Sequence, residues 1–355
     1  MAPKTAGKNR EAAPHVALYR KYRPGAFSEV RGQEHVVLAL EGALKKNAIP
    51  HALLFAGSRG TGKTSIARIF AHELGATAID TYEIDAASNP GIDDIRELRE
   101  AVHTLPYESP RKVYIIDEVH MLTKEAFNAL LKTLEEPPAH VVFILATTEI
   151  EKLLETILSR CQVFQFRAPT VEILRGAILN ASKGEGFTLT DDAADLIAVA
   201  ADGSFRDALG TTEKVIMASA DKKASADEVA AIIGAPKKAL LLSVLTALHE
   251  KDVQKGIAAL QAVAEENLDM KVFMRMLLER MRAVMLSRHA PLDAKRLYAR
   301  FSEDEVTTIS NIAKDLKTPV NSAALVRMIE ASLMTGKTAI PTLPLEIAIV
   351  ELCAG

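Results

Sequence analysis

A short segment near the start of the chain combines glycines with a lysine and a threonine. It fits the pattern G-x-x-x-x-G-K-[ST], and its residues are Gly57, Ser58, Arg59, Gly60, Thr61, Gly62, Lys63 and Thr64. In this pattern the glycines let backbone N–H groups face phosphate oxygens, the lysine meets the β and γ phosphates, and the hydroxyl binds Mg²⁺. The other interpretation is a glycine-rich turn that happens to contain a lysine. The apolar run HALLFA before it and the helical pattern SIARIF after it favour a loop that binds ATP and Mg²⁺.

Two adjacent carboxylates end the apolar run in KVYIIDEVH. Hydrolysis at a γ-phosphate needs a carboxylate that holds Mg²⁺ and a group that orients the attacking water. Asp117 suits the first role and Glu118 the second. The pair could instead cap the helix that follows, and His120 is interpreted as structural rather than catalytic.

Short apolar runs alternate with helical patterns from Leu18 to about Arg167, which predicts a parallel sheet covered on both faces, with ligand chemistry at the carboxyl ends of its strands. After FRAPT the strand signals stop and amphipathic helices follow. The expected organisation is a disordered tail (1–16), an α/β nucleotide-binding domain (17–167), a small helical domain (168–233) and an all-helical C-terminal domain (234–355).

Composition narrows the function classes. The 355 residues are 48% hydrophobic and 25% charged, with a net charge of -3, so the chain does not read as a protein that coats nucleic acid. Only Cys161 and Cys353 are present, which gives neither a disulfide framework nor a zinc site. Because we find no export signal and no long apolar run, we expect a cytoplasmic protein without a membrane span.

Several segments occur in the order typical of one family. They are LYRKYRPGAFSEVRGQEHV, GSRGTGKTSIAR, EIDAASN, DEVHML, FNALLKTLEEPP, LATTE, ILSRC and GSFRDAL. From Leu18 to Ile233 the chain thereby resembles the bacterial clamp-loader ATPases, the gamma/tau subunits of DNA polymerase III, and beyond Ile233 it resembles them only loosely. The resemblance implies an AAA+ P-loop NTPase fold with a parallel sheet, a helical lid and a helical collar.

The resemblance also assigns roles to single residues. Thr147 of LATTE corresponds to the first sensor, which helps to position the water. Arg160 of ILSRC corresponds to the arginine finger, which reaches the ATP site of a neighbouring subunit, and Arg206 of GSFRDAL to the second sensor, which touches the γ-phosphate of its own subunit. From the residues alone, Thr147 could be an ordinary threonine at a strand end and Arg160 a surface salt-bridge residue.

The leading YRKYRP segment and Val30 resemble the stretch that closes over adenine and ribose, so Arg23 and Val30 are assigned to nucleotide binding. Arg31 departs from the small apolar residue of many relatives. The four-cysteine zinc module of the family has no counterpart, because HELGATAIDTYEIDAAS passes through that place without a cysteine, and a structural zinc is therefore not expected. The sequence ends at Gly355, so we do not expect within it the long extension that some relatives carry after the collar.

Functionally, the resemblance implies an ATPase subunit that opens a sliding clamp and loads it onto primer-template DNA as part of the DNA polymerase III holoenzyme. Its partners would be delta-like and delta-prime-like clamp-loader subunits, the sliding clamp and the DNA, and copies would join into an open ring through the C-terminal helices. DNA contacts would follow phosphates rather than sequence. The alternatives are a Holliday-junction branch-migration motor or another AAA+ machine, a non-hydrolysing scaffold subunit of the clamp loader, and a eukaryotic or archaeal small clamp-loader subunit.

Overall fold

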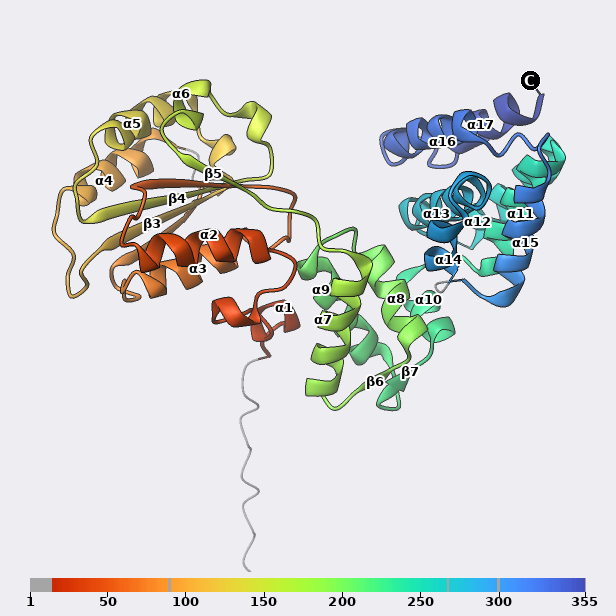
Figure 1. Cartoon of the computed structure of the whole chain (residues 1–355), viewed down its shortest axis with the longest axis horizontal. Coiled ribbons are helices and arrows are strands. Elements are labelled where there is room, and N and C mark those ends of the chain that lie inside the picture. Colours follow the sequence, from red (N-terminus) through yellow and green to blue (C-terminus); the bar gives the residue numbers. More distant parts are fainter. Residues whose placement is uncertain (1–14, 89–90, 267, 299–300, 355) are drawn as a thin grey trace, which may run out of the picture.

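The computed structural model describes residues 15–88, 91–266, 268–298 and 301–354. Most of the expected disordered tail, residues 1–14, lies outside the described residues. The chain forms a sheet domain, a small helical domain and a larger helical domain in sequence order, and the small helical domain lies between the other two (Figure 1). Each of the three has its own buried core.

The sheet has five parallel strands, and the alternating pattern predicted a parallel sheet. The strand order is β2-β3-β4-β1-β5. The strands are β1 (Ala52–Ala56), β2 (Thr81–Asp85), β3 (Lys112–Asp117), β4 (Val141–Thr147) and β5 (Gln162–Gln165). Ala56 pairs with Thr147 and Asp85 with Asp117, so the carboxyl ends of neighbouring strands stand level. The segments that follow these strands therefore meet at one edge of the sheet.

Helices cover both faces of the sheet, with α2 (Glu34–Lys45) and α3 (Lys63–Glu73) below it and α4 (Ile92–Val102) and α5 (Lys124–Glu135) above it in Figure 1. Helices α2 and α3 pack with Leu53 and Phe55 on one face, whereas α4 and α5 pack with Leu54 on the other. Alternate residues of β1 thus enter opposite cores, as a strand buried on both faces requires. Short helical turns η1 (Phe27–Glu29), η2 (Val119–Met121) and η3 (Ile150–Lys152) and helix α6 (Glu155–Leu158) complete this domain.

The small helical domain, hereafter the lid, contains α7 (Val171–Gly184), α8 (Asp191–Ala200), α9 (Phe205–Ala218) and α10 (Ala226–Ile233). Each helix begins after a serine or threonine that accepts a backbone N–H bond, namely Thr170, Thr190, Ser204 and Ser225. The lid also holds two strands that the sequence analysis missed, β6 (Thr188–Leu189) and β7 (Lys223–Ala224), which pair in parallel. Two residues are too few to display the alternation that reveals a strand.

The first helix departs from the expected domain boundary. Helix α1 (Leu18–Lys21) belongs by sequence to the nucleotide-binding domain, but Leu18 packs against Ala181 and Leu209 of the lid. Tyr22, which follows α1, donates a 2.6 Å hydrogen bond to Glu185 of the lid. The N-terminal segment therefore bridges the two domains at the place where the nucleotide is expected.

The C-terminal domain, hereafter the collar, is a bundle. Its helices are α11 (Lys238–Glu250), α12 (Val253–Glu265), α13 (Met270–His289), α14 (Pro291–Tyr298), α15 (Glu303–Lys314), α16 (Ser322–Met334) and α17 (Leu343–Ala354). Helix α13 lies in the core, and its buried Arg280 pairs with the buried Glu305 of α15. Within the described ranges, no single helix has both the length and the apolarity to cross a membrane, and one pair bent by 77°, α10 with α11, passes by length and composition only.

Candidate active site

The glycine-rich loop joins β1 to α3 and fits its surroundings closely. A Cβ atom on Gly57 would stand 2.5 Å from the carbonyl oxygen of Phe166, and one on Gly60 would stand 2.0 Å from the hydroxyl of Ser204. Gly62 has a φ of 101°, a conformation that side chains oppose, and space lies open beside it. The loop therefore needs glycine at these positions, and helix α3 begins with Lys63 at the end of the loop.

Lys63 is buried within this loop. Its Nζ donates hydrogen bonds to the carbonyl oxygens of Gly57 at 2.8 Å and Ser58 at 3.0 Å. Burial lowers the pKa of Lys63, and the nearby carboxylates of Glu118 and Asp117 oppose this shift. A buried ammonium group held only by loop carbonyls is well suited to exchange them for phosphate oxygens.

Thr64 and Asp117 bring two oxygen ligands together. The Thr64 hydroxyl donates a 2.6 Å hydrogen bond to Oδ2 of Asp117, which ends β3. Oxygen atoms of a hydroxyl and a carboxylate are ligands that Mg²⁺ prefers, and the ion keeps its other positions for water and phosphate. The pair therefore fits the predicted magnesium site.

Glu118 follows in a conformation that non-glycine residues seldom adopt, with φ 48° and ψ 44°. Its carboxylate Oε2 accepts hydrogen bonds from the backbone N–H of Thr148 at 3.2 Å and from the Thr148 hydroxyl at 2.9 Å. Unfavourable backbone conformations persist where the surroundings hold them, and they gather at active sites. The strain places the Glu118 carboxylate beside the end of β4.

Thr148, rather than Thr147, donates hydrogen bonds to Glu118. Thr147 is fully buried, and its hydroxyl lies 2.9 Å from Nδ1 of His120 and accepts a hydrogen bond from the backbone N–H of Glu149. Successive residues of a strand face opposite sides, so only one of the two adjacent threonines can meet Glu118. The segment LATTE contains both threonines, and the sequence alone does not show which of them contacts Glu118.

His120 lies between the carboxylates of Glu118 and Glu149. Its Nε2 lies 3.2 Å from Glu149, and its Nδ1 lies 3.5 Å from Glu118 Oε2 as well as near Thr147. The imidazole is almost entirely buried. These contacts agree with a structural His120 that orders the end of β4.

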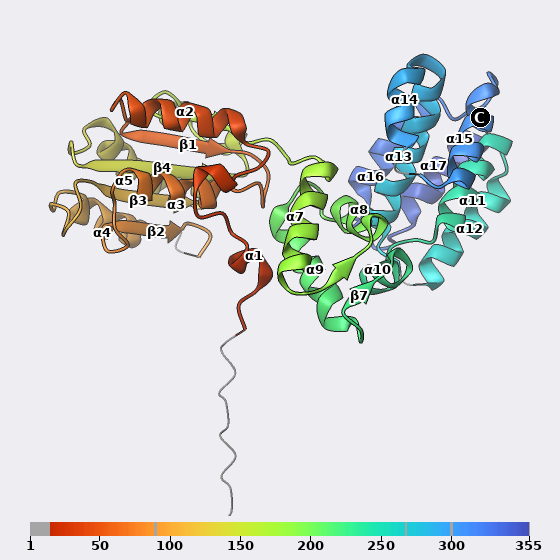
Figure 2. The same ribbon diagram turned by 60° about the horizontal axis from the view of Figure 1, so that its bottom comes forward.

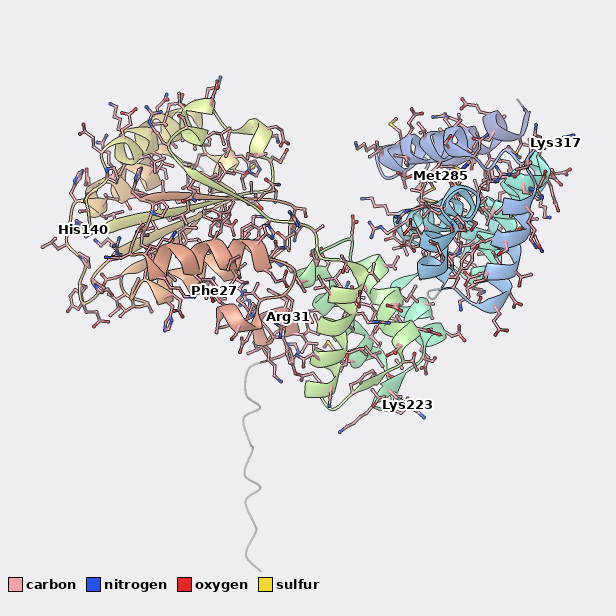
Figure 3. All side chains as sticks on the ribbon, in the orientation of Figure 1. Phe27, Arg31, His140, Lys223, Met285 and Lys317 are labelled. Carbon is pink, nitrogen blue, oxygen red and sulfur yellow. The ribbon has the colours of Figure 1, made fainter. Side chains whose placement is uncertain are left out.

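A cavity of about 1120 Å³ lies between the sheet domain and the lid, and most of the predicted site residues line it. They are Arg23, Val30, Arg59, Gly60, Thr61, Gly62, Lys63, Thr64, Asp117, Glu118 and Arg206. The lid adds Ile173 and Leu209 to the lining, and with Val30 they offer apolar surface for a base. Figure 3 shows Arg31, another lining residue, at the junction of the two domains.

Cationic groups gather around the same cavity. The guanidinium of Arg206 lies 5.1 Å from the ring centroid of Tyr19, and hydrogen bonds from Arg20 and then Arg206 lower the pKa of Tyr19. Burial lowers the pKa of Arg23. Such a cluster provides a favourable potential for a polyanion.

Two contacts between the loop and its surroundings were not predicted. The buried Gln33 donates to the carbonyl oxygens of Thr61 at 3.4 Å and Arg167 at 2.7 Å, and so ties the loop to the segment that enters the lid. The backbone N–H of Phe205, at the start of α9, donates to the Gly60 carbonyl at 2.9 Å. The segments RGQE and GSF carried these residues, but no sequence pattern indicates their partners.

Arg160 lies away from this cavity. It follows α6, at the amino end of β5, and its guanidinium donates to Glu135 at 2.6 Å and to the carbonyl oxygen of Thr156 at 2.9 Å. Its side chain is 33% exposed, so a neighbouring molecule can reach it. The chain thus brings Lys63, Thr64, Asp117, Glu118 and Arg206 around one cavity and leaves Arg160 outside it.

Family models match two separate parts of the chain with DNA polymerase III proteins. The model described as DNA polymerase III, delta subunit, matches residues 77–170, and the model for domain III of the DNA polymerase III subunits gamma and tau matches residues 224–353. A third model, magnesium chelatase subunit ChlI, matches residues 26–115. The second match covers most of the collar, where the sequence resemblance was loose.

Solved structures support the fold alone. The RuvB Holliday junction branch migration motor of Thermotoga maritima has a TM-score of 0.52 and 24% identity, and the alignment covers 64% of this chain and 80% of that chain. This similarity shows the AAA+ arrangement of sheet domain and lid.

Curated relatives extend over nearly the whole chain. The chain is 36% identical to DNA polymerase III subunit tau of Bacillus subtilis over 364 residues, which cover 96% of the chain and 63% of the relative. It is 37% identical to subunit gamma/tau of Mycobacterium tuberculosis over 365 residues (95% and 62%), and 42% identical to subunit tau of Escherichia coli over 297 residues (77% and 46%). The chain spans less than two thirds of the length of these relatives. It belongs to the family of DNA polymerase III gamma/tau subunits.

Proposed function

We propose that the chain is an ATP-hydrolysing subunit of the replicative clamp loader, which opens a sliding clamp and places it on primer-template DNA within the DNA polymerase III holoenzyme. The observation that carries the proposal is that Lys63, the Thr64–Asp117 pair and Glu118, which accepts hydrogen bonds from Thr148, surround one cavity between the sheet domain and the lid. Family membership supplies the biological setting.

Different residues of the site would bind the phosphates, the metal ion and the nucleoside. Lys63 would exchange the carbonyls of Gly57 and Ser58 for β and γ phosphate oxygens, and backbone N–H groups of the loop would hold the phosphates. Thr64 and Asp117 would hold Mg²⁺, which supplies charge neutralisation at the β and γ phosphates. The cavity is also lined by Arg23, Val30, Ile173 and Leu209, which would contact ribose and base.

Glu118 would orient the water that attacks the γ-phosphorus and accept its proton, while the bond to the leaving ADP oxygen breaks. The two hydrogen bonds from Thr148 orient the carboxylate and make Thr148, in this proposal, the first sensor. Arg206 would contact the γ-phosphate from the lid, so that the lid position depends on whether the nucleotide is ATP or ADP.

Arg160 would complete the site of an adjoining subunit. Its position outside the cavity of its own chain supports this role, because a finger acting in trans must face outward. In the single chain Glu135 neutralises the guanidinium until a neighbour replaces it. Catalysis would therefore need assembly.

The collar offers surface for that assembly. Val326, Ile329 and Leu333 on α16 are exposed at helical spacing, and Ile347 and Val350 are exposed on the neighbouring α17. We propose that these helices join copies of the chain, with delta-like and delta-prime-like subunits, into an open ring. The ring would hold the clamp and track DNA phosphates in the cytoplasm.

Two alternatives are less well supported. A Holliday-junction motor shares the fold of the first two domains, but the described residues from 234 to 354 form only helices and match gamma and tau domain III. A non-hydrolysing scaffold does not require the Glu118–Thr148 pair next to an intact phosphate loop. A clamp-loading ATPase accounts for both features.

The test measures ATP turnover with a sliding clamp and primed DNA for the wild type and Arg160→Ala. We expect the variant to lose turnover on the order of 10³-fold while its affinity for ATP stays within a few fold, because the finger acts on the transition state. Arg111→Ala is the matched control, since Arg111 also precedes a strand at this edge of the sheet. Unchanged turnover in Arg160→Ala would refute the trans role, and absence of clamp-stimulated turnover in the wild type would refute the function.

A further inference from the structure

The turn between α8 and α9 contacts all three domains. It comprises Ala201, Asp202, Gly203 and Ser204, and its two central residues have φ values of 52° and 72°. The Ser204 hydroxyl accepts the backbone N–H of Asp207 and thereby caps α9, the helix that carries Arg206. The position of this turn therefore sets the position of Arg206.

On one side the turn presses against the sheet domain. A Cβ atom on Gly60 would stand 2.0 Å from the Ser204 hydroxyl, and the neighbouring Phe205 donates its N–H to Gly60. A Cβ atom on Gly203 would stand 2.9 Å from that of Ala168, in the segment that joins the sheet domain to the lid. The turn cannot move relative to the phosphate loop without breaking these contacts.

On the other side the turn is held by the collar. Arg275 of α13 donates to the carbonyl oxygen of Val199 at 2.6 Å, in the last turn of α8, and lies 2.6 Å from the Asp202 carboxylate. The last carbonyls of a helix lack partners within the helix, and a cation there is favourable. Figures 1 and 2 both show α8 on the side of the lid that faces the collar.

We propose that Arg275 is a positioning residue that fixes the turn from the collar side and so sets how Arg206 meets the γ-phosphate. The contacts run without a gap from α13 through Arg275, the turn and Ser204 to Gly60 of the phosphate loop. A change in the loop on loss of the γ-phosphate then reaches the collar through the same contacts. This inference rests on the proposed ATP site.

A packing role alone makes a different prediction. If Arg275 only joined two domains, its loss would lower stability and weaken binding of ATP and ADP equally. A residue that positions Arg206 affects ATP more than ADP, because only ATP presents a γ-phosphate. The ratio of the two affinities therefore separates the two roles.

The experiment measures dissociation constants of fluorescently labelled ATP and ADP, each with Mg²⁺, for the wild type, Arg206→Ala, Arg275→Gln, Arg275→Lys and Arg282→Gln. Arg282 is the matched control, because it lies on the same helix, lines the same 420 Å³ groove as Arg275 and is exposed. Arg275→Lys keeps a cationic donor for Val199 and Asp202. Thermal unfolding of each variant monitors the fold.

We expect Arg206→Ala to remove most of the preference for ATP over ADP and Arg275→Gln to reduce that preference about five-fold, within the range for mutations that alter coupling between sites. Arg275→Lys should restore most of it, and Arg282→Gln should match the wild type. An unchanged preference in Arg275→Gln, or equal weakening of both nucleotides, would overturn the inference. Failure of the wild type to bind either nucleotide would refute the proposed function itself.

Discussion

Each edge of the five-stranded sheet holds a buried lysine, and the two lysines differ in what surrounds them. Lys63, at the carboxyl ends of the strands, donates to two carbonyl oxygens of a loop that borders a large cavity. Lys112, at the amino ends, donates to the carbonyls of Ala101 and Thr104 and to the Thr104 hydroxyl, where α4 ends. Lys112 uses its N–H donors in hydrogen bonds that hold the end of α4, whereas a ligand can replace the partners of Lys63.

Two aspartates, Asp80 and Asp117, differ between the two edges of the sheet in the same way. Asp80, at the amino edge, is fully buried and accepts three backbone N–H bonds from Tyr107, Glu108 and Ser109. Asp117, at the carboxyl edge, is partly exposed and pairs with the hydroxyl of Thr64. The comparison teaches that burial and hydrogen bonding alone do not identify a catalytic group. An adjoining cavity and exchangeable partners do.

The strongest test of this comparison substitutes each lysine by alanine. Lys63→Ala should weaken binding of ATP more than 100-fold with little change in stability, because phosphate contacts are lost but only loop carbonyls are vacated. Lys112→Ala should lower the free energy of unfolding by about 2–3 kcal/mol, because the hydrogen bonds from its buried ammonium group to Ala101 and Thr104 are lost, and should leave binding nearly unchanged. Nucleotide titration and urea unfolding measure the two effects.

The reverse outcome would contradict the comparison. If Lys112→Ala lost nucleotide binding while it remained folded, the amino edge would take part in function. If Lys63→Ala unfolded, its bonds to Gly57 and Ser58 would be structural in the same sense as those of Lys112.

A narrower test uses the adjacent threonines. Thr148→Val should lower turnover about ten-fold without a large loss of stability, because Glu118 loses a hydrogen bond that orients it. Thr147→Val should instead cost about 1–2 kcal/mol of stability, because the buried His120 loses one of its hydrogen-bond partners. Steady-state ATPase assays and thermal unfolding distinguish the pair, and a larger loss of turnover in Thr147→Val would return the sensor role to Thr147.

The sequence predicted the sheet domain well because its signals are local. The G-x-x-x-x-G-K-T segment lies between a strand and a helix, and Asp117 ends an apolar run, so the motif and the topology together placed Lys63, Thr64, Asp117 and Glu118 at one edge. The family resemblance added Arg206, which lines the same cavity.

Features that depend on tertiary packing could not be predicted. Which threonine of LATTE meets Glu118 is decided by the orientation of the last residue of β4, and both residues have the same type. Helix α1 joins the lid because Leu18 finds Ala181 and Leu209 there, more than 160 residues away in sequence. One partner of Arg275 is the backbone carbonyl of Val199, and residue types in the sequence do not reveal a contact with a carbonyl.

The smallest expected effect is a pH dependence of stability, which Asp80 at the amino edge should produce. Burial alone would raise the pKa of Asp80, but the N–H bonds from Glu108 and Tyr107 and the bonds from Ser109 outweigh it and lower the pKa to about 2. Since the pKa of an aspartate in an unfolded chain is about 3.9, the ionised Asp80 stabilises the fold fully above that pH and loses this contribution as pH falls towards 2.

Asp80→Asn should therefore unfold at lower urea than the wild type at pH 7, because an amide cannot accept all three N–H bonds. The difference between the two midpoints should shrink as pH falls from about 5 to 3. Urea midpoints measured at several pH values give the result, and Asp221→Asn, at an exposed site of the lid, is the control. A difference that stayed constant with pH would show that the shape of the side chain, and not its charge, holds the 107–109 segment. The nucleotide affinity of Asp80→Asn should stay unchanged at pH 7, because no atom of this cluster borders the cavity.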